Sequence, residues 1–155
     1  MKRRESITTY NRVAPVEELP ESPELERAVL GALILEPAYL PDVRAIVESS
    51  TFHDANNGKI FDVLAAMDDE QAKIDLYTLL QRCRQVDPGI KPAHLAQLTQ
   101  CVGSGVNVLD HARRLKDVEI RRRLCLFGQE LSARAAADPD GVIDWATEFS
   151  VASPV

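Results

Sequence analysis

The sequence contains few aromatic residues: four Phe, three Tyr and one Trp make up 5% of its 155 residues. A core with so few rings must be built from aliphatic side chains, which favours packed helices over a sandwich of strands. No apolar run approaches the ~20 residues that a membrane-spanning helix needs. The basic residues at 1–5 are not followed by an apolar stretch, so no signal peptide is predicted. These absences exclude the secreted and membrane-spanning classes of protein.

Cysteine is also scarce. Cys83, Cys101 and Cys125 are odd in number, far apart in the sequence and surrounded by apolar residues. This pattern indicates reduced thiols that behave as small core residues, and it argues against a disulfide framework. We therefore expect a cytoplasmic protein that folds without disulfides or metal, since a chain of this length buries enough surface to do so.

Motifs that carry catalysis are missing as well. Gly103-Ser104-Gly105 lacks the spaced glycine and the Lys-Ser/Thr pair that bind a triphosphate. His53, His94 and His111 have no cysteine or carboxylate at metal-ligand spacing, and none forms a nucleophile motif with a cysteine. The acids at 68–70 lack the alternating ligands and the glycine of a calcium-binding loop. We therefore predict no catalytic residue, no cofactor-binding residue and no metal ligand in this chain.

Charge is plentiful but unevenly distributed. The net charge is −6 and the isoelectric point is near 5.1, which argues against a protein that mainly coats nucleic acid. Residues 17–75 contain fourteen acids and four bases, a net of −10, whereas residues 106–137 contain seven bases and four acids, a net of +3. Six of these bases fall within residues 113–123: Arg113, Arg114, Lys116, Arg121, Arg122 and Arg123.

Two interpretations of the basic stretch stay open. In the first, it is a solvated helix face whose arginines pair with Asp117, Glu119 or the acidic body. In the second, it binds an acidic partner or a nucleic-acid backbone. A dedicated DNA-reading helix is disfavoured, because each residue turns a helix by about 100° and three consecutive arginines therefore point in different directions.

Apolar periodicity predicts short helices up to residue 105, after a flexible tail at residues 1–20. Ser22-Pro23 combines an N-cap residue with a proline at the first helical position. A second helix is expected from Pro41, and Asn56-Asn57-Gly58 predicts a turn before the next helix. Acids at 68–70 are expected in a solvated loop. Asp75 is predicted to cap another helix, and Pro92 to open one after the break at Asp87-Pro88-Gly89.

The longest predicted element is a helix of about thirty residues at 106–137, where no proline intervenes. Val108, Ala112 and Leu115 form one apolar stripe, but the next positions of that register are Glu119 and Arg122. A second stripe consists of Ile120, Leu124, Phe127 and Leu131. We therefore expect the apolar face to shift near residues 118–120. The first half of the helix should pack on the body, and the second half should project toward another partner.

A tight turn is predicted at Asp138-Pro139-Asp140-Gly141, because these residues favour turns. Apolar residues at helical spacing follow it: Val142, Ile143, Trp145, Ala146 and Phe149. Together with the long helix they form a helical hairpin. Its apolar face serves either as an interface or as a surface that folds back on the body. The predicted fold is therefore all-α, with a compact helical bundle at 21–105 followed by a long helix and C-terminal helical hairpin at 106–155.

Several segments together resemble the N-terminal domain of the bacterial replicative DNA helicases of the DnaB type. Residues 23–34, PELERAVLGALI, resemble the family's opening "AE-x-x-VLGA" helix, and Lys59-Ile60-Phe61 resembles the end of "H-x-x-IF". Residues 74–79, IDLYTL, are close to "IDLVTL", residues 104–108 resemble "SAANI", and residues 121–124 resemble "x-x-R-x-L". The motifs occur in order over residues 20–150. At the family's "DFY" turn around Phe52, however, Thr51 and His53 replace the acid and the second aromatic residue.

The resemblance implies a non-catalytic collar domain that acts in DNA replication. In the family, such domains pair through their hairpins and form a trimer of dimers on the hexameric motor ring, where they dock primase and respond to the loader. ATP and Mg²⁺ belong to the family's motor domain, whose residues are not part of this sequence. We therefore expect either a fragment of an ATP-dependent helicase, which is the simpler explanation, or a stand-alone relative. DNA would be reached only through the assembled ring, and no membrane partner is expected. The implied self-association residues are Leu124, Phe127, Leu131, Val142, Trp145 and Phe149, and the implied docking residues are Arg121 and Arg122.

Two other functions remain as alternatives. The chain would be a nucleic-acid-binding helical module if the basic helix at 113–123 bound DNA, in which case affinity would depend steeply on salt. The second alternative is a helicase-binding domain of a primase, because the fold of such a domain is similar in outline. The ordered "VLGA" and "IDLYTL" segments match the helicase better.

Overall fold

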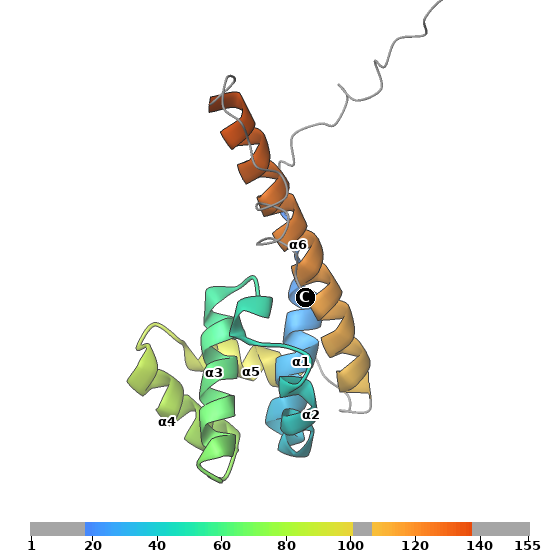
Figure 1. Ribbon diagram of the computed structural model, residues 1–155. Coiled ribbons are helices and arrows are strands. Elements are labelled where there is room, and N and C mark those ends of the chain that lie inside the picture. The colour runs from blue at the N-terminus through green and yellow to red at the C-terminus, as the bar shows by residue number, and fades with distance from the viewer. Residues whose placement is uncertain (1–17, 101–106, 138–155) are drawn as a thin grey trace, which may run out of the picture.

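The computed structural model describes residues 18–100 and 107–137, and all of their regular structure is helical (Figure 1). Helix α1 (Pro23–Leu35) lies at the centre, where its apolar face packs against α5 (Pro92–Gln100) and α6 (Val108–Ala137). Short elements follow α1, namely η2 (Pro37–Tyr39), α2 (Leu40–Arg44) and η3 (Ser49–Thr51). Helices α3 (Ala55–Asp69) and α4 (Leu76–Val86) complete the body. The all-α fold class is confirmed.

The core is aliphatic, as the scarcity of aromatic residues predicts. Val29, Leu30 and Leu33 on α1 are fully buried and face Leu95 and Leu98 of α5 across one continuous cluster. The cluster also takes in side chains from α2, α3, α4 and α6, and in it the rings of Phe52 and Phe61 pack at an interplanar angle of 37° with their centroids 5.2 Å apart. Burial of many Leu, Ile and Val side chains therefore holds the body together.

Helix boundaries agree with several sequence predictions. Pro23 opens α1 and Pro92 opens α5, and α4 ends at Val86 before the Asp87-Pro88-Gly89 break. Asp75 caps α4: its carboxylate accepts a hydrogen bond from the Thr78 backbone N–H at 2.9 Å, and the Thr78 hydroxyl oxygen accepts one from the Asp75 N–H. This reciprocal capping satisfies two backbone donors that a helix end otherwise leaves open.

Two local predictions are wrong. Asn56-Asn57-Gly58 is not a turn but the first turn of α3, because Asp54 caps that helix by accepting hydrogen bonds from the N–H groups of Asn56 and Asn57. Gly58 is needed there for close packing, since a Cβ at this position would lie 2.8 Å from the carbonyl oxygen of Ser49. Asp68 and Asp69 lie in the last turn of α3, where Arg44 pairs with both, and not in a solvated loop.

Helix α6 runs from Val108 to Ala137, close to the predicted span, and its second half extends beyond the body (Figure 1). The predicted shift of its buried face is wrong. Glu119 and Arg122 stay in register with Val108, Ala112 and Leu115, and all five side chains are buried. The expected projection of the second half is nevertheless observed. The predicted turn at 138–141 and the helix after it lie outside the described residues, as do the tail at 1–17 and Cys101.

Candidate functional site: the projecting helix and its attachment

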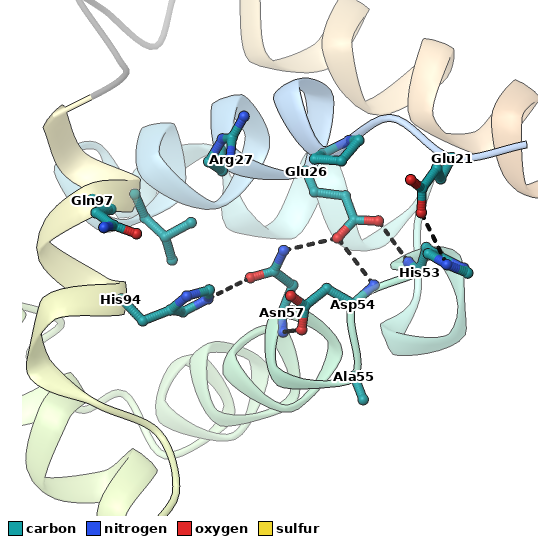
Figure 2. A pocket seen from close by; sticks show the side chains of 11 residues that line it. Glu21, Glu26, Arg27, His53, Asp54, Ala55, Asn57, His94 and Gln97 are labelled. Carbon is teal, nitrogen blue, oxygen red and sulfur yellow. Dashed lines mark hydrogen bonds and ion pairs between the residues drawn. The ribbon is translucent and has the colours of Figure 1, made fainter.

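A buried carboxylate ties α1 to the corner that precedes α3. Glu26 is only 1% exposed, and it accepts hydrogen bonds from the backbone N–H of His53 at 2.6 Å, from the N–H of Asp54 at 3.3 Å and from the side-chain amide of Asn57 at 2.8 Å. Figure 2 shows this carboxylate aimed at all three donors, with His94 on the far side of Asn57. Because the Asn57 amide nitrogen donates to Glu26, its oxygen accepts from the ring of His94 at 2.8 Å.

A hollow of about 440 Å³ opens beside this network, between α1, α5 and the 53–57 corner. Its wall is mixed: the polar residues Glu21, Arg27, Asp54 and Gln97 line it together with the two histidines, and Pro23, Ala55 and Leu98 supply apolar surface. Glu21 is paired with His53 at 3.0 Å. No group of three potential metal ligands gathers anywhere in the described residues. The histidines therefore act here as hydrogen-bonding partners of the corner.

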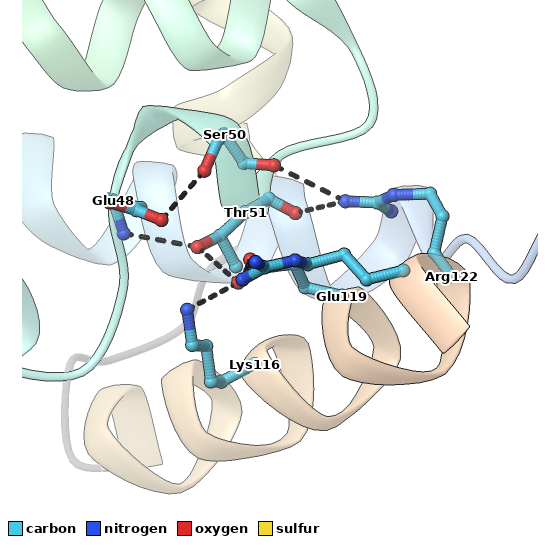
Figure 3. Close-up of polar contacts among 7 residues, drawn as sticks. Glu48, Ser50, Thr51, Lys116, Glu119 and Arg122 are labelled. Atoms are coloured by element: carbon cyan, nitrogen blue, oxygen red, sulfur yellow. Dashed lines mark hydrogen bonds and ion pairs between the residues drawn. The ribbon is translucent and has the colours of Figure 1, made fainter. Parts of the chain in front are cut away.

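The segment just before this corner, η3 at Ser49–Thr51, holds α6. Thr51 is fully buried, and its hydroxyl donates to the carboxylate of Glu119 at 2.8 Å while accepting from the Glu48 N–H at 3.1 Å. Arg122, 7% exposed, donates to the carbonyl oxygens of Thr51 at 2.7 Å, Ser50 at 3.5 Å and Pro20 at 3.3 Å. Figure 3 shows these side chains converging on the η3 corner from one face of α6. We call Thr51, Glu119 and Arg122 the polar clasp.

Glu119 is charged although it is buried. Burial by itself raises the pKa of its carboxyl group, but hydrogen bonds from Lys116 and Thr51, together with the charges of Lys116 and Arg123, lower the pKa below its usual range. Lys116 lies 2.6 Å and Arg123 3.5 Å from the carboxylate. The two cations belong to the same helix, three residues before and four residues after Glu119, so α6 neutralises most of this charge itself.

The other bases of the predicted basic stretch do not form one exposed cationic surface. Arg114 pairs with Asp110 at 2.9 Å, and Lys116 and Arg123 pair with Glu119. Within residues 18–100 and 107–137, Arg113, Arg121 and Arg122 are the bases of this stretch without a carboxylate in ion-pair range, and Arg122 bonds to backbone carbonyls instead. The first interpretation, a solvated face whose cations pair with acids of the same chain, describes three of the six bases, namely Arg114, Lys116 and Arg123, whereas Arg122 is buried.

Alongside the clasp and beyond it, α6 exposes apolar side chains. Ile120 is 36% exposed, Leu124 is 55% exposed and Leu126 is 46% exposed, whereas Phe127 and Leu131 are half-buried. Helical spacing aligns Ile120, Leu124, Phe127 and Leu131 as one stripe. Leu126 follows Arg122 by four residues and continues the buried face past the point where the body ends. We call Ile120, Leu124, Leu126, Phe127 and Leu131 the distal apolar surface.

Comparison with known families identifies the family of this domain. Residues 18–117 match the model of the DnaB-like helicase N-terminal domain. The chain belongs to this family. It is 32% identical over 108 residues to the replicative DNA helicase DnaB of Rhodothermus marinus and 32% identical over 122 residues to that of Treponema pallidum. These matches cover 68% and 77% of this chain but only 12% and 28% of the two helicases.

Solved structures agree on the fold of the DnaB-type domain. The N-terminal domain of DnaB helicase from Mycobacterium tuberculosis superposes with a TM-score of 0.76 at 19% identity, covering 87% of this chain and 95% of that one. The corresponding domain from Helicobacter pylori, described with its interactions with primase, gives 0.62 at 25% identity over 74% and 89% of the two chains. None of the helices in the described part of our chain combines the length and apolarity needed to cross a bilayer.

The residues predicted for self-association and docking are only partly brought together. Leu124, Phe127 and Leu131 lie on the distal apolar surface, whereas Val142, Trp145 and Phe149 lie outside the described residues. Arg121 is exposed and available to a partner, but the guanidinium of Arg122 is already occupied by three backbone carbonyls of its own chain. The docking role of both arginines stays a prediction, and for Arg122 the structure supplies an internal role.

Sequence reasoning missed the polar part of this DnaB-type domain. Glu26, Asn57 and Thr51 gave no signal, because nothing local distinguishes a buried polar residue from a solvated one. Glu119 and Arg122 did give a signal: they fall in the register of Val108, Ala112 and Leu115. Continuing that register would have placed them against the body. Cys83 is buried as predicted, and burial raises the pKa of its thiol to about 11, which keeps it protonated and unreactive.

Proposed function

We propose that this chain is the assembly and docking module of a replicative DNA helicase and that copies of it associate through the distal apolar surface. One observation carries the proposal: α6 extends past the body with Leu124 and Leu126 exposed, next to exposed Ile120. Large apolar side chains concentrated on a projecting element are typical of interfaces. Pairing would give a dimer, or a trimer of dimers in a hexameric parent, and hydrolysis of ATP with Mg²⁺ would belong to that parent's motor.

Sedimentation velocity over a concentration series tests the self-association. We expect a dimer or larger species, and we expect Leu124→Asp to raise its dissociation constant at least about tenfold, because it places a charge in a desolvated interface. Tyr77→Asp is the matched control: Tyr77 is 70% exposed on α4, at the start of a helix where an acid is tolerated. A wild-type monomer at every concentration, or equal effects of the two variants, would contradict the proposal.

Docking of primase is the second part of the proposal, and a loader is a further candidate partner. It is supported by the relative from Helicobacter pylori, whose structure is described with its interactions with primase. Titration with the helicase-binding domain of a primase tests it. Arg121→Ala should weaken binding, since Arg121 is exposed on α6, whereas Arg113→Ala removes an equally exposed charge eight residues away and should not. Equal affinities of both variants would remove Arg121 from the docking surface.

The nucleic-acid-binding alternative makes a contrasting prediction. A module that bound DNA through residues 113–123 would lose affinity steeply as salt rises. The internal pairing of Arg114, Lys116 and Arg123 and the burial of Arg122 leave few cations for phosphates, so we expect no such binding in the isolated chain.

A further inference from the structure

The attachment of α6 to the body has two chemically different parts. Val108, Ala112 and Leu115 are at most 1% exposed and belong to the hydrophobic core. The next two positions of the same face hold Glu119 and Arg122, which contact the body through hydrogen bonds. We propose that the apolar part is a pivot and that the polar clasp sets the angle at which the distal half of α6 leaves the body, opening and closing as a unit.

The contacts of the clasp converge on a very small target. Thr51 supplies both its hydroxyl, to Glu119, and its carbonyl oxygen, to Arg122, and the remaining acceptors are the carbonyls of the neighbouring Ser50 and of Pro20. Losing the fit between α6 and η3 therefore breaks all of the contacts with residues 50–51 together.

Opening the clasp leaves no buried charge without a partner. Glu119 keeps Lys116 and Arg123, which lie on its own helix and move with it. Arg122 and the carbonyl oxygens of Pro20, Ser50 and Thr51 become accessible to water, which replaces their hydrogen bonds. An apolar contact of the same extent would expose hydrocarbon on separation, whereas this one exchanges protein partners for water. The pivot of Val108, Ala112 and Leu115 stays packed.

The lever beyond the clasp is long. Twenty-two residues separate Leu115, the last residue of the pivot, from Ala137, which corresponds to about 33 Å of helix. A rotation of ten degrees about the pivot thus moves the helix end by roughly 6 Å. The clasp thereby determines where the distal apolar surface lies relative to the body. The inference concerns a single chain and does not depend on the self-association proposed above.

Pulsed electron–electron resonance between two spin labels tests the inference. Exposed Ala66 on α3 and Ala133 on α6 serve as label sites in a background in which Cys101 and Cys125 are Ser and Cys83 is Ala. An excess of unlabelled protein removes distances between copies. Arg122→Met retains the aliphatic stem but not the guanidinium, and Arg121→Met is the matched control one residue away. Circular dichroism checks that each variant is folded.

We expect Arg122→Met to broaden or shift the distance distribution by several ångströms and Arg121→Met to leave it as in the parent. Thr51→Val, which removes a single hydroxyl from the same contacts, should act in the direction of Arg122→Met and decides the question if Arg122→Met does not fold. A folded Arg122→Met variant with the parent's distribution would overturn the proposal. So would an unchanged distribution in Thr51→Val together with an unfolded Arg122→Met.

Discussion

Replacing Glu26 by Ala removes the shared acceptor of three hydrogen bonds that join α1 to the corner before α3. Two of the bonds are short, 2.6 Å from the His53 N–H and 2.8 Å from the Asn57 amide, and the third, from the Asp54 N–H, is long at 3.3 Å. A hydrogen bond to a charged group contributes about 1.5–3 kcal/mol, and a buried donor left unpaired costs a similar amount. The two short bonds therefore set the expected loss at roughly 3–6 kcal/mol.

Urea denaturation followed by circular dichroism measures this loss. The hollow beside Glu26 admits water to some of the freed donors, which keeps the expected value near the lower end of the range. Glu24→Ala is the matched control, because Glu24 lies in the same helical turn but is exposed and 3.6 Å from Arg27. It should change stability by no more than about 0.5 kcal/mol. A Glu26→Ala variant as stable as Glu24→Ala would refute the structural role of this carboxylate.

Three further outcomes follow from the packing of the helices. In the same urea titrations, Gly58→Ala should destabilise the fold by roughly 1–3 kcal/mol, because the added Cβ would lie 2.8 Å from the carbonyl oxygen of Ser49. Gly128→Ala should instead stabilise the fold by about 0.5–1 kcal/mol, because its added Cβ would have nothing within 4 Å and alanine favours the helix. The pKa of Glu119 is lowered from its ordinary 4.5, so its ionised carboxylate stabilises the fold above that pH. In thermal melts, the difference in melting temperature between the parent and Glu119→Gln should therefore shrink as the pH falls from about 5 through the lowered pKa. Leu33→Asp should abolish the helical signal, since it places a charge among fully buried side chains of α1.

The sequence was sufficient to predict those parts of the fold in which apolar spacing and capping residues agree. The start of α1 at Pro23, the cap of α4 at Asp75 and the span of α6 depend on local patterns that tertiary contacts do not override. The turn predicted at residues 56–58 failed for a physical reason. Asn and Gly do favour turns, but the cap supplied by Asp54 and the close approach of Ser49 to Gly58 determine the local structure.

The contacts of the polar clasp could not be predicted from the sequence for a related reason. Periodicity arguments treat a buried position as an apolar one, so an acid at 119 and a base at 122 were interpreted as the end of the buried face. Their burial depends on Thr51, which lies 68 residues before Glu119, and on carbonyl oxygens that every residue possesses. The register of α6 places Glu119 and Arg122 on the face toward the body, but only the folded chain shows which groups they meet there.

A helix of thirty residues that packs through leucines alone can slide along its own axis, because one apolar side chain replaces another one turn further on. Glu119 and Arg122 prevent this on α6. A shift by one turn, about 5.4 Å, would separate Glu119 from the Thr51 hydroxyl and bury the guanidinium of Arg122 against hydrocarbon. The two charged residues therefore fix how much of the helix lies on the body and how much extends beyond it.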